Sequence, residues 1–161
     1  MEQACIQEIH RLHDEFVKWF TAFVPNTEEN FVPISSALSS DFHMVPPKGL
    51  LVSQPDLTNS LRSAYGCRKD SPSFRIEIKN CKILCDETKK SNQQGLTGNG
   101  LCVVSYEEWQ YVGDKEESGR ISTVVFRCNN ESLAADVNRK ERNILWLNVH
   151  ETWIQGREPK S

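Results

Sequence analysis

The sequence has no long apolar run. No stretch of its 161 residues approaches the roughly 18 consecutive apolar residues that a bilayer-spanning helix requires. The first ten residues also lack a cationic segment followed by an apolar one, which is the pattern of a secretory leader. The sequence therefore predicts a cytoplasmic protein with no membrane partner, in a compartment where thiols stay reduced.

Paired cysteines are missing too. The six cysteines form no Cys-x-x-Cys motif, and they are Cys5, Cys67, Cys81, Cys85, Cys102 and Cys128. Cys81 and Cys85 are four positions apart, which on a strand separates them by about 13 Å, too far for a disulfide. We interpret the cysteines as small hydrophobic groups rather than as metal or redox sites.

Signatures of phosphate binding, metal binding and nucleophilic catalysis are also absent. The sequence contains no GxGxxG, no G-x-S-x-G and no H-E-x-x-H motif. His10, His13 and Asp14 lie within one turn of a predicted helix, a spacing that can bind zinc, but no further strong ligand accompanies them. His13 also falls on the apolar stripe of that helix, where a buried structural histidine is more common. We therefore expect no cofactor and no metal.

Positive charge is scarce. The net charge is −3 and the pI is about 5.8, whereas nucleic-acid binding needs a basic surface that displaces counterions. Arg62, Arg68 and Lys69 form at most a local patch, which is more typical of a solvated surface. We expect no nucleic-acid partner.

What is present is an ordinary globular composition, with 38% hydrophobic and 25% charged residues. The length fits one domain, residues 1–161. Apolar residues from Ile6 to Phe23 recur at spacings of three and four, which predicts an amphipathic helix ended by Pro25. A short second helix with Pro33 in its first turn should follow and close at Ser39–Asp41.

Beyond this point the period changes to that of strands. Residues 42–45 and 50–52 predict a hairpin, and Ser53 predicts the cap of a third helix that ends at Gly66. Four strands should then follow in sequence, at residues 74–84, 101–112, 120–128 and 144–154. Long loops are expected at residues 86–100 and 129–143, and a turn at residues 113–119. Helices followed by strands predict an α+β domain with an antiparallel sheet.

Four stretches resemble the nuclear-transport-factor-2-like (SnoaL-like) superfamily. They are residues 40–49, 106–110, 123–127 and 146–153. The last stretch is similar to the final strand of the calcium/calmodulin-dependent protein kinase II association domain. The residues of this sequence that fit the pattern of that strand are Trp146, Asn148, Val149 and His150. Thr152 stands where that strand has a second His.

The resemblance implies a cone-shaped curved sheet wrapped around the N-terminal helices, a cystatin-like roll with a pocket at its open end. Members commonly form homodimers through the outer face of the sheet. Some are isomerases, cyclases or dehydratases, and others only bind small molecules or assemble larger proteins. The fold alone therefore does not name the activity.

Period-two geometry places Trp146, Asn148, His150 and Thr152 on one face of the last strand. We expect this half-polar face to be a pocket wall or an interface. His150 is the leading catalytic candidate because imidazole titrates near neutral pH, and its alternative role is structural. Trp146 is a candidate ligand-binding residue on the same face.

The neighbouring strands supply further candidates. Glu107 beside Trp109 could act as a general acid or base if both face a dry pocket, and as a solvated charge beside a core indole if they do not. Arg127 could hold an anionic group or lie at the surface. Tyr65 could donate a hydrogen bond opposite them. The candidate ligand-binding residues are therefore Trp109, Arg127, Trp146 and Tyr65.

Three functions are consistent with this sequence. The leading hypothesis is a homodimeric domain that binds an unknown small-molecule ligand in the curved sheet, since aromatic and polar side chains mix on the predicted pocket strands. The alternatives are an acid–base enzyme that uses His150 or Glu107, and an assembly domain.

Overall fold

The computed structural model describes residues 1–88, 100–128 and 143–159. Most of the two predicted long loops, residues 86–100 and 129–143, lies outside these residues. The described chain contains the helices α1 (Glu2–Phe20), α2 (Glu28–Ser35) and α3 (Gln54–Ser63). Among the helices of the described residues, none combines the length and the apolar character that crossing a membrane requires.

The helix boundaries follow the sequence signals closely. The Thr27 hydroxyl accepts a hydrogen bond from the backbone N–H of Asn30 at the start of α2, and Ser53 accepts one from Asp56 at the start of α3. Pro33 is the sixth residue of α2, so the predicted place in the first turn is wrong, because the helix already begins at Glu28. Of the predicted stripe, α1 buries Ile9 and Leu12, and it also buries Cys5 and Trp19. Phe23, the last residue of that stripe, lies beyond the helix and is 80% exposed.

The strands form one sheet in the order β2-β1-β6-β5-β4-β3. Their bounds are β1 (Leu38–Val45), β2 (Val52–Ser53), β3 (Arg75–Asp86), β4 (Gly100–Val112), β5 (Lys115–Cys128) and β6 (Ile144–Trp153). β1 pairs with β6 in parallel, and all other neighbours are antiparallel. The α+β class is thus confirmed, with a mixed sheet where sequence alternation predicted an antiparallel one.

Two strands begin earlier than expected. Ser39, Ser40 and Asp41 belong to β1 and do not close α2. The predicted turn at residues 113–119 is confined to Gly113 and Asp114, because β5 starts at Lys115. Gly113 has a φ of 58°, which a glycine adopts without strain, so the chain can reverse within these two residues.

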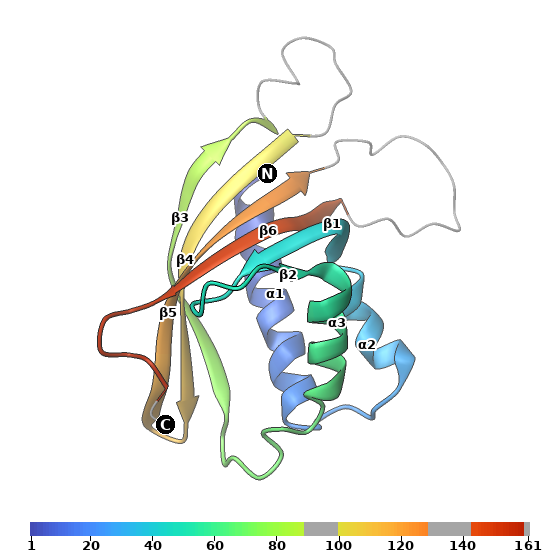
Figure 1. Ribbon diagram of the computed structural model, residues 1–161, viewed down its shortest axis with the longest axis vertical. Coiled ribbons are helices and arrows are strands. Elements are labelled where there is room, and N and C mark those ends of the chain that lie inside the picture. The colour runs from blue at the N-terminus through green and yellow to red at the C-terminus, as the bar shows by residue number, and fades with distance from the viewer. Residues whose placement is uncertain (89–99, 129–142, 160–161) are drawn as a thin grey trace.

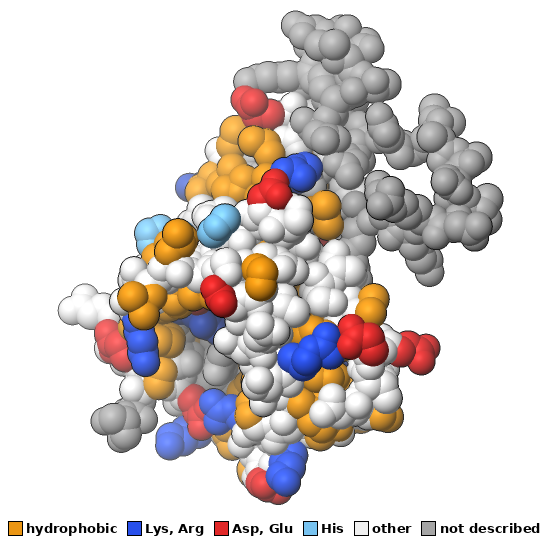
Figure 2. Space-filling view, turned by 45° about the vertical axis from the view of Figure 1, so that its right-hand side comes forward, with side chains coloured by type: hydrophobic (Ala, Val, Ile, Leu, Met, Phe, Trp, Pro, Cys, Tyr) orange, Lys and Arg blue, Asp and Glu red, His pale blue; other side chains and the backbone are white. Residues whose placement is uncertain are grey.

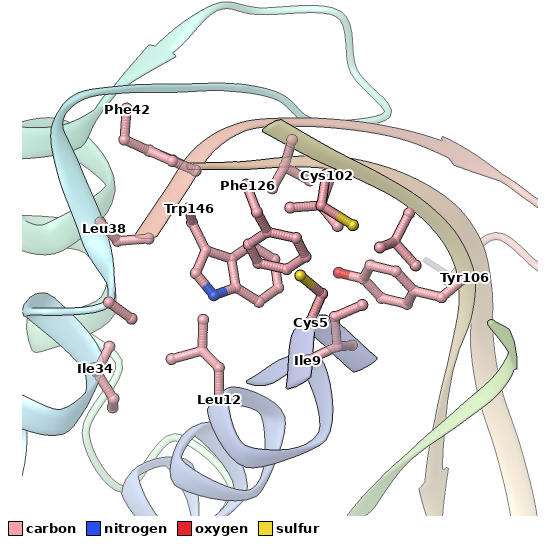
Figure 3. Packing of buried hydrophobic residues seen from close by; sticks show 14 of the residues in the cluster. Cys5, Ile9, Leu12, Ile34, Leu38, Phe42, Cys102, Tyr106, Phe126 and Trp146 are labelled. Carbon is pink, nitrogen blue, oxygen red and sulfur yellow. The ribbon is translucent and has the colours of Figure 1, made fainter. Parts of the chain in front are cut away.

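The helices all lie on the concave side of the curved sheet (Figure 1). α1 runs along this hollow, and its apolar stripe meets the inward side chains of β4, β5 and β6. Trp146, Phe126, Leu12, Ile9 and Tyr106 converge there (Figure 3), all with exposed fractions of 3% or less. The core fills the closed end of the hollow, and the space nearer α3 remains open.

Candidate functional site

A cavity of about 270 Å³ lies between the inner face of the sheet and the helices α1 and α3. Its apolar lining comes from both helices, from the strands β1, β3, β4 and β6, and from the residue that follows β1. The apolar lining residues are Leu12, Phe16, Phe20, Leu38, Phe42, Met44, Pro46, Leu57, Leu61, Ile76, Tyr106, Trp146 and Val149. The polar lining is His13, Glu108, Gln110, Arg120 and Glu151. Such a cavity with few polar groups is typical of a small-molecule site.

The polar lining residues form one connected wall, which we call the charged wall: His13, Glu108, Gln110, Arg120 and Glu151. The Arg120 guanidinium donates to Glu108 Oε1 and, at 3.0 Å, to Glu151 Oε2. His13 Nε2 lies 3.1 Å from Glu108 Oε2, and Gln110 Nε2 donates to Glu108 Oε1 at 2.9 Å. Glu108 therefore receives donors on both oxygens, and Arg120 joins two carboxylates.

The ring of His13 lies between two hydrogen-bond acceptors. Nδ1 lies 2.8 Å from the Ile9 backbone carbonyl, which can only accept, so Nδ1 carries a proton. Nε2 faces the Glu108 carboxylate, which also accepts. Both ring nitrogens thus lie against acceptors, and the side chain is only 4% exposed.

Burial and charge act in opposite directions on Glu108. Burial alone favours the neutral acid, but the charge of Arg120 and the hydrogen bond from His13 outweigh it and hold the pKa of Glu108 well below its usual range. For Arg120, burial likewise opposes the charge, yet Glu108 and Glu151 raise its pKa. Both groups thus remain ionised within the fold.

Glu151 differs from Glu108. Burial and the nearby charge of Glu108 raise the pKa of Glu151 above its ordinary value, although Arg120 opposes this rise. Burial followed by the two carboxylates also raises the pKa of the Tyr106 hydroxyl well above its usual value. The charged wall therefore holds two carboxyl groups with pKa values displaced in opposite directions, which is a pattern of acid–base sites.

The structure brings one of the predicted site residues, Trp146, into the cavity lining. Its indole ring lies 5.0 Å from the ring of Phe126, and its N–H donates to Glu8 at 3.3 Å. His150 lies on the opposite, outer face of the sheet and is exposed.

A β-bulge explains why Trp146 and His150 lie on opposite faces. Phe126 pairs with Trp146 and Val125 with Asn148, so Leu147 is the extra residue. The alternation of β6 reverses there, and Trp146 shares the inner face with Val149 and Glu151. The shared face expected for Trp146 and His150 is wrong for this reason.

Glu107 and Trp109 also lie on the outer face, because Tyr106 and Glu108 of β4 point inward. The Trp109 indole donates to Glu107 at 2.9 Å and covers Gly119, where a Cβ would come within 2.8 Å of the ring. The ammonium of Lys79 lies 5.5 Å from the ring centroid of Trp109. The acid–base role considered for Glu107 required both side chains to face a dry pocket, and neither lines the cavity.

The two other candidates are placed elsewhere as well. Arg127 lies on the outer face of β5, where it meets Asp41 at 3.4 Å. The Tyr65 hydroxyl donates to the Val24 carbonyl at 3.0 Å, and its ring packs 4.8 Å from that of Trp19. Tyr65 therefore connects the segment after α3 with α1 and the segment that follows α1. It is not among the residues that line the cavity.

Sequence reasoning missed Glu108, Arg120 and Glu151. A signal existed for the first two, since Glu108 continues the inward alternation of Cys102, Val104 and Tyr106, and Arg120 continues that of Ser122 and Val124. Glu151 had no such signal because the bulge at Leu147 hides its face. His13 lies on the apolar stripe of α1, as predicted, and the interpretation as a buried histidine agrees with its 4% exposure.

The geometry of the fold matches several solved structures. A nuclear-transport-factor-2-like protein of unknown function from Pseudomonas aeruginosa superposes with a TM-score of 0.70 over 94% of this chain and 98% of its own, at 24% identity. The chain has the nuclear-transport-factor-2-like fold. A protein from Nostoc punctiforme with a cystatin-like fold gives a TM-score of 0.57 over 95% of this chain and 90% of its own, at 8% identity.

A third similar structure is that of a putative calcium/calmodulin-dependent protein kinase type II association domain from Thiobacillus denitrificans. It covers 89% of this chain and 93% of its own length with a TM-score of 0.52 and 13% identity. No family model and no curated protein matches the sequence. These likenesses establish the fold, and the function must be argued from the site itself.

Proposed function

We propose that this protein binds a small, largely apolar molecule in the cavity beside the charged wall. The observation that carries the proposal is the combination of a 270 Å³ hollow lined mostly by apolar side chains with charged groups gathered on one wall. Apolar walls supply binding free energy through buried area, and the polar wall orients the ligand. The two-ring compound 2-methylnaphthalene is a suitable first probe because it has only apolar atoms.

Filling the cavity should abolish binding of this probe. Ile76 of β3 lines the cavity, so Ile76→Trp adds a large ring to the space that the ligand needs. We expect the dissociation constant for 2-methylnaphthalene, measured by probe fluorescence, to rise at least about tenfold. Ile121→Trp is the matched control, because Ile121 is 39% exposed on the outer face of β5. Equal loss of binding in both variants, or in neither, contradicts the proposal.

Acid–base catalysis is a second candidate function. It is supported by the opposite pKa displacements of Glu108 and Glu151, which leave Glu151 with a raised pKa beside an apolar cavity. This alternative moves the acid–base role from His150 and Glu107 to Glu151.

Replacement of Glu108 should change the titration of Glu151. Because burial raises the pKa of Glu151 first and the Glu108 charge raises it further, Glu108→Gln should lower that pKa. Carbon-detected NMR of labelled glutamate carboxyls measures this change, with Glu107→Gln on the outer face as control. A Glu151 pKa that stays unchanged or rises in Glu108→Gln would remove the electrostatic basis of the catalytic candidate.

We also propose that the protein forms a homodimer through the outer face of the sheet. Three apolar side chains there are substantially exposed: Leu84, Leu101 and Ile121, at 52%, 43% and 39%. Figure 2 shows hydrophobic side chains gathered in the upper part of the described surface and beside two histidines. The solved association domain supports assembly as a further role of this fold.

A charge on this face should weaken the dimer. Ile121→Lys places an ammonium among the outer side chains of β4, β5 and β6, since Ile121 pairs with Glu107 and Thr152. We expect light scattering to show a dimer for the unaltered protein and a dissociation constant at least about tenfold higher for the variant. Phe23→Lys, at an 80% exposed position away from the sheet, serves as control. A monomer at all concentrations, before any substitution, overturns the dimer proposal.

A further inference from the structure

The inference below rests on the proposed ligand-binding function and names the class of ligand. We infer that the cavity takes a neutral molecule whose hydroxyl or amide N–H donates a hydrogen bond to the Glu151 carboxylate. Arg120 does not act as an anion receptor in this arrangement, although an arginine in a pocket is the usual partner of a carboxylate or phosphate.

Each terminal nitrogen of Arg120 already donates to a buried carboxylate inside the protein. One terminal nitrogen donates to Glu108 and the other lies 3.0 Å from Glu151 Oε2. The side chains of Glu108 and Glu151 are only 3% and 5% exposed, so water cannot easily replace these bonds. An incoming anion would have to displace a buried carboxylate from Arg120, which leaves that carboxylate without its cation.

The charged groups of the wall are paired with one another without a ligand. Arg120 pairs with both Glu108 and Glu151, and His13 Nε2 lies 3.1 Å from Glu108. The next charged groups on α1, Glu8 and Arg11, form a pair of their own at 2.6 Å. A charged ligand would therefore add an uncompensated charge to an apolar cavity, whereas a neutral ligand would not.

The two carboxylates of the wall differ in their spare acceptor capacity. A carboxylate has about four lone-pair sites. Glu108 already accepts from Arg120, Gln110 and His13. Glu151 accepts from Arg120, and from the Ser122 hydroxyl only at a long 3.4 Å. Of the two carboxylates, Glu151 thus has more unused acceptor sites at the cavity, and their complement is a donor on the ligand.

The size of the cavity limits the rest of the ligand. A volume of 270 Å³ corresponds to about nine water molecules of liquid, which is enough for a molecule of one or two rings. Aromatic side chains on two sides, Phe16 and Phe20 from α1 and Phe42 from β1, suit a flat apolar body. A compact aromatic or alicyclic alcohol or amide therefore has the right shape and chemistry.

Four probes that share one ring system test this inference at pH 7.5: 2-naphthol, 2-methylnaphthalene, 2-naphthoate and 2-naphthylmethylammonium. They carry respectively a neutral donor, an apolar group of similar size, an anion and a cation. We expect 2-naphthol to bind about tenfold more tightly than 2-methylnaphthalene, and both ions to bind more weakly than 2-naphthol by at least about tenfold. Dissociation constants are measured by probe fluorescence and calorimetry.

Any other order of the four probe affinities contradicts either the inference or the binding function. Tightest binding of 2-naphthoate or of 2-naphthylmethylammonium overturns the inference while leaving the binding function intact, and so does equal binding of 2-naphthol and 2-methylnaphthalene. Failure of all four probes to bind removes the proposed function itself.

A charge substitution on the wall provides an independent check. Glu151→Gln removes one negative charge from the wall, so binding of 2-naphthoate should improve about tenfold relative to 2-naphthol. Glu107→Gln makes the same change on the outer face of the sheet and should leave the ranking unaltered. An unchanged ranking in Glu151→Gln, with the fold retained by circular dichroism, overturns the assignment of Glu151.

Discussion

Replacing Arg120 by methionine should lower the free energy of unfolding by about 3–5 kcal/mol at pH 7, because it removes the cation between two buried carboxylates. Urea denaturation followed by tryptophan fluorescence measures this loss. Arg127→Met is the matched control, since Arg127 lies on the same strand but pairs on the outer face with an Asp41 side chain that is 69% exposed. We expect little change in that variant.

The loss caused by Arg120→Met should depend on pH with a defined sign. In the unaltered protein, the lowered pKa of Glu108 stabilises the fold above the ordinary glutamate value of 4.5, and this contribution disappears only as the pH falls through the lowered value. Without Arg120, burial raises the carboxyl pKa values, so the folded variant binds more protons than its unfolded chain. Its stability should therefore fall as the pH rises from 5 to 7. A gap between variant and unaltered protein that stays constant across this range contradicts the account.

Replacing Trp19 by alanine should cost about 3–5 kcal/mol of unfolding free energy. Trp19 is fully buried, its ring lies 5.0 Å from Phe31, and its N–H donates to the Leu61 carbonyl at 2.9 Å. The substitution therefore opens a cavity and detaches α3, which carries Leu57 and Leu61 of the cavity wall. We expect 2-methylnaphthalene to bind more weakly as well.

Phe23 provides the control for Trp19. It is also aromatic and lies four residues further along the chain, but it is 80% exposed. Phe23→Ala should change the unfolding free energy by no more than about 0.5 kcal/mol. Chemical denaturation measures the unfolding free energy of both variants. Similar decreases in the two variants would mean that Trp19 does not hold α1 in place.

The order of helices and strands could be predicted from periodicity because each element buries one face. The stripe of α1 and the alternation at Phe74, Ile76 and Ile78 follow directly from that requirement. The parallel pairing of β1 with β6 could not be predicted this way, because alternation says which face is buried and not which strand is the neighbour.

The candidate site was harder to predict than the fold. Trp146 was placed at the cavity correctly, but the bulge at Leu147 reverses the faces of β6 and sends His150 outward. On β4, the aromatic Trp109 suggested the inner face, whereas the buried residues beside Tyr106 place Glu108 there. Buried charges are rare in sequences, and three-dimensional pairing with Arg120 and His13 is what makes Glu108 tolerable inside.

The most direct test of the central claim is an NMR titration of the isotopically labelled protein with 2-naphthol. The account predicts that the methyl signals of Met44 and Ile76, which line the cavity, shift in a saturable manner. The methyl signal of Ile121, on the outer face, should remain in place. Saturable shifts at Ile121 without shifts at Met44 and Ile76, or no shifts at any of them, would contradict ligand binding inside the curved sheet.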